Sequence, residues 1–396
     1  MIPRMTLDIS WFDLAYGLVS SIGPAKPKYR IVEDLWLREQ SLAFLSVRSA
    51  WDCFLATRDW PQGSEIMISA ITIPHMAEII SAWGFIPVPV DINPDDMSLD
   101  LNSIERLASE KTKALLLAHL FGGFIDLDPL AKLCKQKNWV LIEDCAQAYD
   151  GTAYRGHEGA DLSLFSFGTI KSATALGGAM ITIRDADLRS VLAKYRNQQK
   201  IHPQYQFTKK VFKSALLKII TVPWCFGLLW SVSCHLGIDF DRLLNASVRG
   251  FSGGQFLDRI RRQPPQALLS LLRRRLSQDR IAYFAQRGEM VQTLYDDLPL
   301  EANQLGHLGL RHSSWIIPIT VPNPIELTQY LRKNGYDATC QSSSMQVIIP
   351  PPGYEEAKQA QSSFTEVLYL PIYTPLGNHG YKRLAQLIRQ YYSEIS

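Results

Sequence analysis

An aspartate and a lysine, Asp144 and Lys171, stand 27 positions apart, and each comes just after an apolar run. Pyridoxal phosphate chemistry requires a carboxylate and an amine at neighbouring strand ends. The amine forms a Schiff base with the cofactor aldehyde, and the carboxylate keeps the pyridine nitrogen protonated. Burial among the small residues around Lys171 would lower its pKa, as a base needs. A lysine on an exposed loop explains the pattern equally well at this stage.

The segment 60–185 alternates short apolar runs with amphipathic stretches, which predicts an α/β domain. The runs are apolar nearly throughout, so they indicate a parallel sheet covered by helices on both faces. Ligands of such sheets bind at the carboxyl ends of the strands, which makes Asp91, His119, Asp144 and Ser166 the first candidates for site residues. The predicted strands are EIMISAI, PVPVDI, KALLLAHLFG, WVLIEDCA, LSLFSF and AMITIRD.

In order and spacing, these stretches resemble the motifs of the DegT-type sugar aminotransferases, a branch of the fold-type I pyridoxal phosphate enzymes. The resemblance covers residues 40–200 well and 280–390 loosely. It implies an α/β fold with a large domain, built on a mainly parallel seven-stranded sheet, and a smaller C-terminal α+β domain. The stretches that carry it are VDINPDDMSLD, KTKALLLAHLFG, WVLIEDCAQAYDG and LFSFGTIK with the glycine pair that follows.

Carried over residue by residue, the resemblance implies that pyridoxal 5'-phosphate is the cofactor and that no metal ion is needed. Lys171 would be the Schiff-base lysine, and Asp144 would be the partner of the pyridine nitrogen. Gln147 would contact the 3-hydroxyl side of the cofactor, and Ser166 would hydrogen-bond its phosphate.

The phosphate should also meet the start of the helix after SVRSAW, because backbone amides at a helix N-terminus bind anions. Arg48 or Ser49 could add to those amides, although an ordinary surface arginine is the alternative for Arg48. Facing the cofactor ring, the family usually places an aromatic residue. Here either His75 stacks on the ring or Ile73 covers it by packing.

Two departures from the family pattern stand out. The Gly-x-Asn-Tyr-Arg motif, which reaches toward the partner subunit's cofactor, is not recognisable. Arg259-Ile260-Arg261-Arg262 stands where it should fall, and arginines are suitable replacements. The acidic residue between glycines after the lysine is also missing, since the chain reads Ala175-Leu176-Gly177-Gly178 there. This second change predicts a different substrate.

The resemblance implies a homodimeric transaminase that moves an amino group from glutamate or glutamine to a keto group, usually on a nucleotide-linked sugar. Two alternatives stay open. The keto substrate could be lipid-linked or amphipathic and be reached at the membrane surface. The chain could also be a sensor or regulator that keeps the fold without turnover.

Composition and charge limit the class of protein, its domain organisation and its expected location. The 396 residues, 46% hydrophobic and 20% charged, are typical of a globular chain with one large and one smaller domain. Six scattered cysteines argue against a disulfide scaffold or a zinc knuckle. Without a basic region followed by an apolar run at the N-terminus, no secretory signal is expected, and a cytoplasmic location is predicted. We expect domains at 1–200 with an N-terminal arm and at 281–396, joined by a basic, aromatic-rich connection at 201–280.

That connection carries 14 Lys and Arg against four Asp and Glu between Lys200 and Arg280, which predicts an anionic partner, with a solvated basic face as the alternative. Residues 207–237 are apolar and aromatic and predict a helical pair that lies at an interface or is buried in a dimer. Pro223 and the short uncharged run argue against a transmembrane span. No nucleic-acid partner is expected. The residues expected to meet lipid or phosphate are Lys209, Lys210, Lys213, Lys218, Trp224, Phe226 and Trp230, followed by a Gly-rich loop at 251–256.

Overall fold

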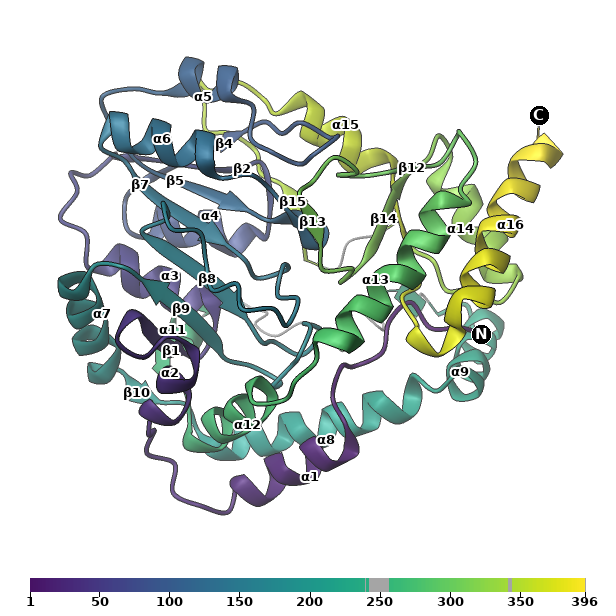
Figure 1. The fold of residues 1–396 in the computed structure, drawn as a ribbon, viewed down its shortest axis with the longest axis horizontal. Helices are drawn as coiled ribbons and strands as arrows, with labels where there is room; N and C mark the ends of the chain where they lie inside the picture. Colours follow the sequence, from purple (N-terminus) through teal and green to yellow (C-terminus); the bar gives the residue numbers. More distant parts are fainter. Residues whose placement is uncertain (239, 242–255, 341–343, 396) are drawn as a thin grey trace.

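A seven-stranded sheet forms the centre of the computed structural model, which describes residues 1–238, 240–241, 256–340 and 344–395 (Figure 1). All six runs predicted as strands form part of this sheet. In order across it, the strands are β1 (Ser41–Phe44), β9 (Ala179–Ile183), β8 (Leu162–Ser166), β7 (Val140–Asp144), β5 (Thr112–Ala118), β2 (Glu65–Ser69) and β4 (Ile86–Val90).

The sheet is mainly parallel, as predicted. Strands β8, β7, β5, β2 and β4 run the same way, so their carboxyl ends lie at one edge. Strand β9 is antiparallel to both of its neighbours, β8 and β1. Strand β1 was not predicted, because it has only four residues and is recruited to the edge by pairing with β9 rather than by a local pattern.

Helices cover both faces of the sheet, and alternate residues of one strand show this. On β2, Ile66 and Ile68 pack in a cluster with residues of the helices at 47–56 and 74–82, whereas Met67 packs in the cluster of the opposite face. The covering helices are α3 (Val47–Ala56), α4 (Pro74–Ala82), α5 (Leu101–Leu107), α6 (Asp128–Lys137) and α7 (Ala186–Gln198).

A second, smaller layer follows near the C-terminus. Its antiparallel sheet holds β12 (Asn303–Gln304), β14 (Ile317–Thr320) and β16 (Val367–Leu370). The N-terminal segment joins it, because Ile2 bridges to Tyr336 and Met5 to Ile372. The helices of this layer are α13 (Ile281–Asp296), α14 (Pro324–Lys333) and α16 (Gly377–Ile395).

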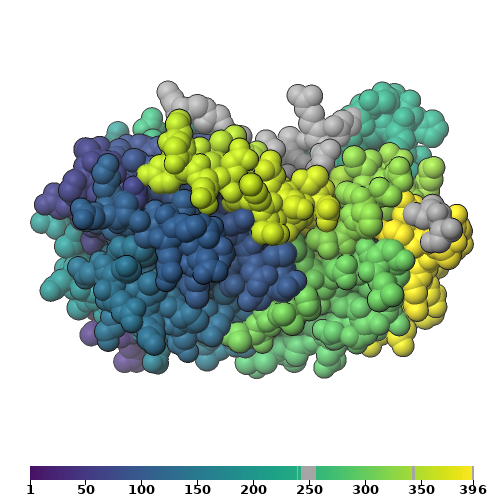
Figure 2. Space-filling model, turned by 90° about the horizontal axis from the view of Figure 1, so that it is seen from above, coloured from purple at the N-terminus to yellow at the C-terminus, as the bar shows by residue number. Residues whose placement is uncertain are grey.

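Part of the C-terminal stretch returns to the large sheet. Figure 2 shows residues around 350–365, in yellow-green, lying across residues around 60–130, in blue. Here β15 (Gln346–Val347) pairs with β3 (Ile71–Thr72), and α15 (Lys358–Glu366) packs into the same cluster as β4. The domain division at residues 200 and 280 stays a prediction.

The predicted helical pair consists of α8 (Gln204–Ile220) and α9 (Pro223–His235), which meet at a bend of 87°. Among the described residues, none of the helices taken singly has the length and apolar character to cross a membrane, and α8 with α9 passes this test only as a bent pair. Helix α8 lies against α1 (Trp11–Ser20) and α12 (Gln266–Leu276) (Figure 1). Residues 251–255 of the predicted Gly-rich loop lie outside the described residues.

The remaining elements are short. They are α2 (Arg30–Trp36), η1 (Arg38–Gln40), η2 (Leu120–Gly122), β6 (Gly123–Phe124), β10 (Lys200–Ile201), α11 (Phe256–Ile260), β11 (Arg262–Gln263), β13 (Arg311–His312) and η3 (Thr374–Leu376).

Candidate active site

Asp144 and Lys171 lie together at the carboxyl edge of the sheet. Asp144 ends β7 and is buried, and its Oδ1 accepts a hydrogen bond from the Ala146 amide at 2.9 Å. Lys171 lies five residues past the end of β8 and is partly buried, so it is not the exposed loop lysine that the sequence alone allowed. Burial raises the pKa of Asp144. Burial also lowers the pKa of Lys171 to about 7. The charge of Asp144 raises this pKa, and the charge of Arg48 lowers it.

Two contacts from distant segments hold the loop of Lys171. The Lys171 Nζ lies 3.8 Å from the centre of the Trp315 ring, and Trp315 Nε1 donates a hydrogen bond to the Ile170 carbonyl at 2.8 Å. On the other side, the Ala173 amide donates to Asp8 Oδ2 at 2.7 Å. Neither Trp315 nor Asp8 was singled out from the sequence, because nothing local marks a contact across more than 140 positions.

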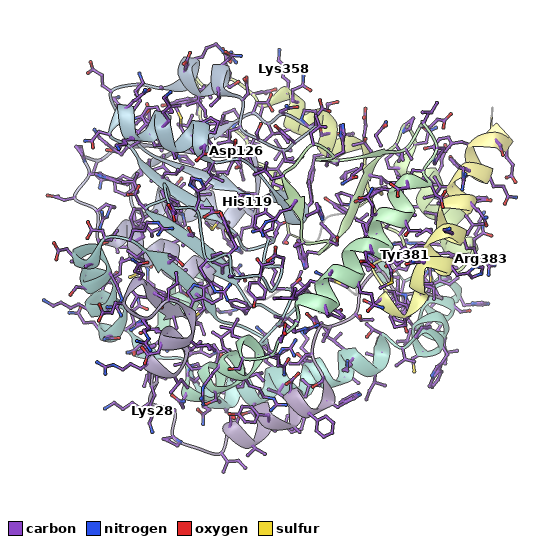
Figure 3. All side chains as sticks on the ribbon, viewed as in Figure 1. Lys28, His119, Asp126, Lys358, Tyr381 and Arg383 are labelled. Atoms are coloured by element: carbon purple, nitrogen blue, oxygen red, sulfur yellow. The ribbon has the colours of Figure 1, made fainter. Side chains whose placement is uncertain are left out.

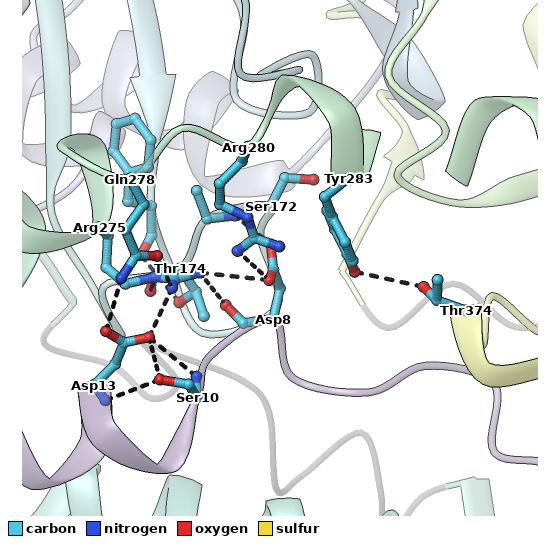
Figure 4. A network of polar contacts seen from close by, with 12 residues as sticks. Asp8, Ser10, Asp13, Ser172, Thr174, Arg275, Gln278, Arg280, Tyr283 and Thr374 are labelled. Atoms are coloured by element: carbon cyan, nitrogen blue, oxygen red, sulfur yellow. Dashed lines mark hydrogen bonds and ion pairs between the residues drawn. The ribbon is translucent and has the colours of Figure 1, made fainter. Parts of the chain in front are cut away.

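Figure 4 shows the polar network behind this loop. Arg275 is buried at its centre, where its guanidinium donates to the Thr174 carbonyl at 3.0 Å and to Asp13 Oδ2 at 2.7 Å. Arg280 forms an ion pair with Asp8 at 2.5 Å. The network therefore ties the lysine loop to α12 and to the N-terminal segment.

Gln147 follows β7 and Ser166 ends β8, so both lie at the carboxyl edge of the sheet. The Gln147 Oε1 accepts a hydrogen bond from the Phe121 amide at 2.8 Å, and its Nε2 lies 3.1 Å from Met345 Sδ. The Ser166 Oγ accepts from the Gly168 amide at 3.4 Å, a long contact. Both side chains are partly buried, as groups that face a bound molecule should be.

The start of α3 has the predicted helix N-terminus. Ser46 caps it, because its Oγ accepts from the Ser49 amide at 3.1 Å and lies 2.9 Å from Ser49 Oγ. The Arg48 Nη1 lies 3.1 Å from His75 Nδ1, and the His75 ring lies 4.5 Å from the ring of Phe256. Burial and then the charge of Arg48 lower the pKa of His75. Ile73 is partly buried immediately before α4.

Lys210 is a candidate site residue whose inward direction on α8 could not be predicted from the sequence. It was expected, together with Lys209 and Lys213, to meet lipid or phosphate. It is partly buried, and its Nζ lies 3.9 Å from the point where a Cβ on Gly177 would stand. Burial, then the charges of Arg48 and Lys213, lower its pKa to about 8. No carboxylate in the part of the chain that the structure describes forms a salt bridge with Lys210 or Lys171.

This set of groups fits pyridoxal phosphate. The amine of Lys171 can react with an aldehyde, and Asp144 can pair with a protonated ring nitrogen. The partly buried amine of Lys210, near Arg48 and a helix N-terminus, suits a phosphate.

Two of the polar residues at strand ends have structural roles instead. The Asp91 carboxylate accepts from the amides of Gln359 and Ala360, so it caps α15. His119 directly follows β5 (Figure 3) and accepts from the Ile125 amide at Nδ1, so its Nε2 donates to Glu143 at 2.7 Å.

Glu143 accepts the hydrogen bond from His119 and is itself held by further hydrogen bonds. Although burial opposes it, hydrogen bonds from His119, Tyr154 and Ser163 lower the pKa of Glu143 to about 2. His119, Glu143 and Cys145 lie close enough together to suggest a metal site. However, both ring nitrogens of His119 are used within the protein, so this cluster is a hydrogen-bonded pair in the core.

The arginines expected to reach a partner subunit lie in and after α11. Arg261 is already engaged, because its guanidinium donates to both oxygens of Asp52 at 2.9 and 2.8 Å. Arg262 lies in β11, which pairs with β10. Arg261 therefore holds α3 in its own chain rather than remaining available for a partner's cofactor.

Comparison with known proteins adds two partial relatives. GDP-perosamine synthase of Caulobacter vibrioides is 34% identical over 139 residues, which are 34% of this chain and 37% of that protein. A pleiotropic regulatory protein of Geobacillus stearothermophilus is 36% identical over 130 residues, which are 32% of this chain and 35% of that protein. The matches thus span little more than a third of either relative's length.

Among solved structures, a putative sugar aminotransferase of Streptococcus pneumoniae, described as its PLP form, matches with a TM-score of 0.68 at 17% identity. The match covers 100% of this chain and 99% of that one. At this identity the likeness shows the fold alone, which is fold-type I. Residues 33–217 match the sequence model of the DegT/DnrJ/EryC1/StrS aminotransferase family.

Proposed function

We propose that this protein is a pyridoxal phosphate-dependent aminotransferase that moves an amino group from glutamate or glutamine to a keto group of a nucleotide-linked sugar. The observation that carries the proposal is the partly buried Lys171, with a pKa of about 7, beside the buried Asp144 at the carboxyl edge of the sheet. The match to a perosamine synthase supports the sugar substrate.

When bound, pyridoxal phosphate supplies an aldehyde that condenses with amines and a ring that accepts electrons. With a pKa of about 7, a large share of Lys171 is neutral at pH 7 and can take a proton from a substrate carbon. Asp144 would hold the proton at the ring nitrogen. Gln147 would orient the ring edge, and Ile73 or His75 would cover the ring.

The phosphate would be bound by Ser166, Lys210 and the first turn of α3 with Arg48 and Ser49. Because Arg261 is paired with Asp52, we propose that Lys210 supplies from the same chain part of the charge that the resemblance assigned to a partner. A homodimer and a cytoplasmic location remain part of the proposal.

A half-reaction tests the proposal. The protein loaded with pyridoxal phosphate should change its visible absorbance when glutamate or glutamine is added, and a 4-keto nucleotide sugar should restore it. A keto sugar that leaves the spectrum unchanged, while an amphipathic ketone restores it, would move the assignment to the lipid-linked alternative.

A regulator that binds the cofactor without turnover is the second candidate, and the match to a pleiotropic regulatory protein favours it. It predicts that the cofactor binds but that neither amino donor changes the spectrum. The retained pair of Lys171 and Asp144 speaks for the enzyme, because binding alone needs no base with a pKa of about 7.

A further inference from the structure

Helix α1 has its amphipathic pattern inverted. The face that includes Asp13 and Gly17 is buried against α12 and α8, whereas the outward face is apolar. Phe12 is 81% exposed and Val19 is 66% exposed. A helix of a globular protein normally presents polar residues to water, so an apolar outward face indicates a further partner. The exposed apolar side chains on or next to α1 are Trp11, Phe12, Tyr16, Val19 and Ile22.

Helix α8 repeats the pattern. Tyr205, Phe212, Leu216 and Ile219 recur at helical spacing on one face, and each is 48–60% exposed. The opposite face of α8, which includes Phe207, is buried. Lys209 and Lys213 lie on the outward face too, whereas Lys210 points inward. Of the anchors predicted on α9, Trp224 is exposed but Phe226 is buried, so Phe226 is not available to a partner.

The two outward faces form one surface. Helices α1 and α8 pack against each other, with Gly17 facing Val211 on their buried sides, and the Lys218 Nζ lies 5.9 Å from the centre of the Trp11 ring. Figure 1 shows both helices along the same side of the molecule. We define the α1–α8 surface by Trp11, Phe12, Tyr16, Val19, Ile22, Tyr205, Lys209, Phe212, Lys213, Leu216 and Ile219.

The charge of this surface has one sign. Residues 204–238 contain no Asp or Glu, and neither do residues 14–32. Asp13 of α1 is fully buried and paired with Arg274 and Arg275. Lysines border the surface, and Figure 3 shows Lys28 at the outer edge beside it. In the described residues of α1 and α8, the exposed charged side chains are basic, and such an apolar face with basic charge matches the headgroup region of an anionic bilayer.

A second copy of the chain fits this surface less well. A two-fold interface brings the same patch of both subunits together, so lysines would meet lysines. No acidic group on the described part of either helix is exposed to offset that repulsion. The charge pattern therefore favours lipid over a second copy.

We propose that the α1–α8 surface docks the protein onto an anionic membrane surface, with the apolar side chains in the headgroup boundary and the lysines against lipid phosphates. Such an interfacial helix pair lies on the bilayer and does not cross it. This inference does not depend on the proposed transamination.

Sedimentation of the full chain with extruded vesicles tests the proposal. The protein should pellet with vesicles of phosphatidylcholine and phosphatidylglycerol but not with phosphatidylcholine alone, and added salt should release it. Lys209→Glu with Lys213→Glu should weaken binding at least about tenfold, since each lysine near the surface is worth roughly a factor of five. Phe212→Ser with Leu216→Ser should weaken binding as well.

Matched controls lie elsewhere on the molecule. Lys132→Glu with Lys135→Glu changes the charge equally on exposed positions of α6, and Leu300→Ser with Ile325→Ser removes exposed apolar side chains elsewhere. Both should retain binding. The proposal is overturned if the wild-type protein does not bind anionic vesicles. It is also overturned if the control variants lose as much vesicle binding as the surface variants. It is also overturned if Phe212→Ser with Leu216→Ser splits a dimer in sedimentation velocity while vesicles bind nothing. The lysine pair keeps the test valid if the serine pair does not fold.

Discussion

The Asp8 carboxylate accepts a hydrogen bond from the Ala173 amide at 2.7 Å, two residues after Lys171. Ala173 has a φ of 51°, in the left-handed region that residues other than glycine seldom adopt. Arg280 and Arg275 hold Asp8 in turn (Figure 4). The conformation of the lysine loop therefore depends on the N-terminal segment, more than 160 positions away.

Replacing Asp8 should release this loop. Asp8→Ala leaves the Ala173 amide without its acceptor and removes the carboxylate that faces Arg280, so we expect the free energy of unfolding to fall by about 1–3 kcal/mol. Urea denaturation measures the change. Asp34→Ala is the control, because Asp34 is exposed on α2 and forms no hydrogen bond or ion pair in the described ranges of the chain. Equal midpoints for the two variants would contradict the role of Asp8.

Lys171 should destabilise the cofactor-free protein at neutral pH. Its pKa is about 7 when folded and 10.5 as its ordinary value, so between these values the unfolded chain binds the extra proton and stability rises with pH. Lys171→Met should raise the free energy of unfolding by roughly 2–4 kcal/mol below pH 7. The gain should shrink as the pH approaches 10.5.

Denaturation series between pH 6 and pH 10 measure that gain on protein freed of cofactor. Lys132→Met, at an exposed position on α6, serves as the control and should show no such pH trend. A constant difference between wild type and Lys171→Met across the series would show that Lys171 has an ordinary pKa.

Asp144 should raise the pKa of its partner. The charge of Asp144 opposes the effect of burial on Lys171, so Asp144→Asn should move the pKa of Lys171 below about 7. The rate at which an amine-reactive arylating reagent labels Lys171, read by peptide mass spectrometry against pH, reports that pKa in cofactor-free protein. If the labelling midpoint of Lys171 stays in place or rises in Asp144→Asn, the charge of Asp144 does not raise the pKa of Lys171.

Lys210 should bind the cofactor phosphate. Lys210→Gln removes a charge next to Gly177, and we expect the affinity for pyridoxal phosphate to fall about tenfold. The neighbouring Lys209→Gln removes the same charge from the outward face of α8 and should leave the affinity unchanged. Absorbance titrations compare the two variants. Similar losses in both would point to a general effect of charge rather than a contact.

The sequence predicts the strands of the large sheet well because each buried strand is an apolar run bounded by turn or helix signals. It also brings Asp144 and Lys171 to one edge, since the carboxyl ends of parallel strands meet there. It fails for β1, whose four residues carry too little pattern and whose position depends on β9.

Which side of a helix faces a site is harder to predict than the helix itself. Lys209 and Lys210 are neighbours in a run of lysines, yet only Lys210 faces the loop of Lys171, because that choice depends on how α8 packs against α1 and α12. Asp91 and His119 show the reverse case. Both follow strands as site residues do, but Asp91 accepts hydrogen bonds from backbone amides and His119 is hydrogen-bonded to Glu143.

The central claim, that Lys171 binds pyridoxal phosphate covalently, is tested most directly by borohydride reduction followed by peptide mass spectrometry. Wild type incubated with the cofactor should absorb in the visible range, and reduction should leave a stable adduct on the peptide that contains Lys171. Lys171→Ala should form no adduct at this site. An unmodified Lys171 in wild type, or an adduct of equal yield on another lysine in both proteins, would contradict the account.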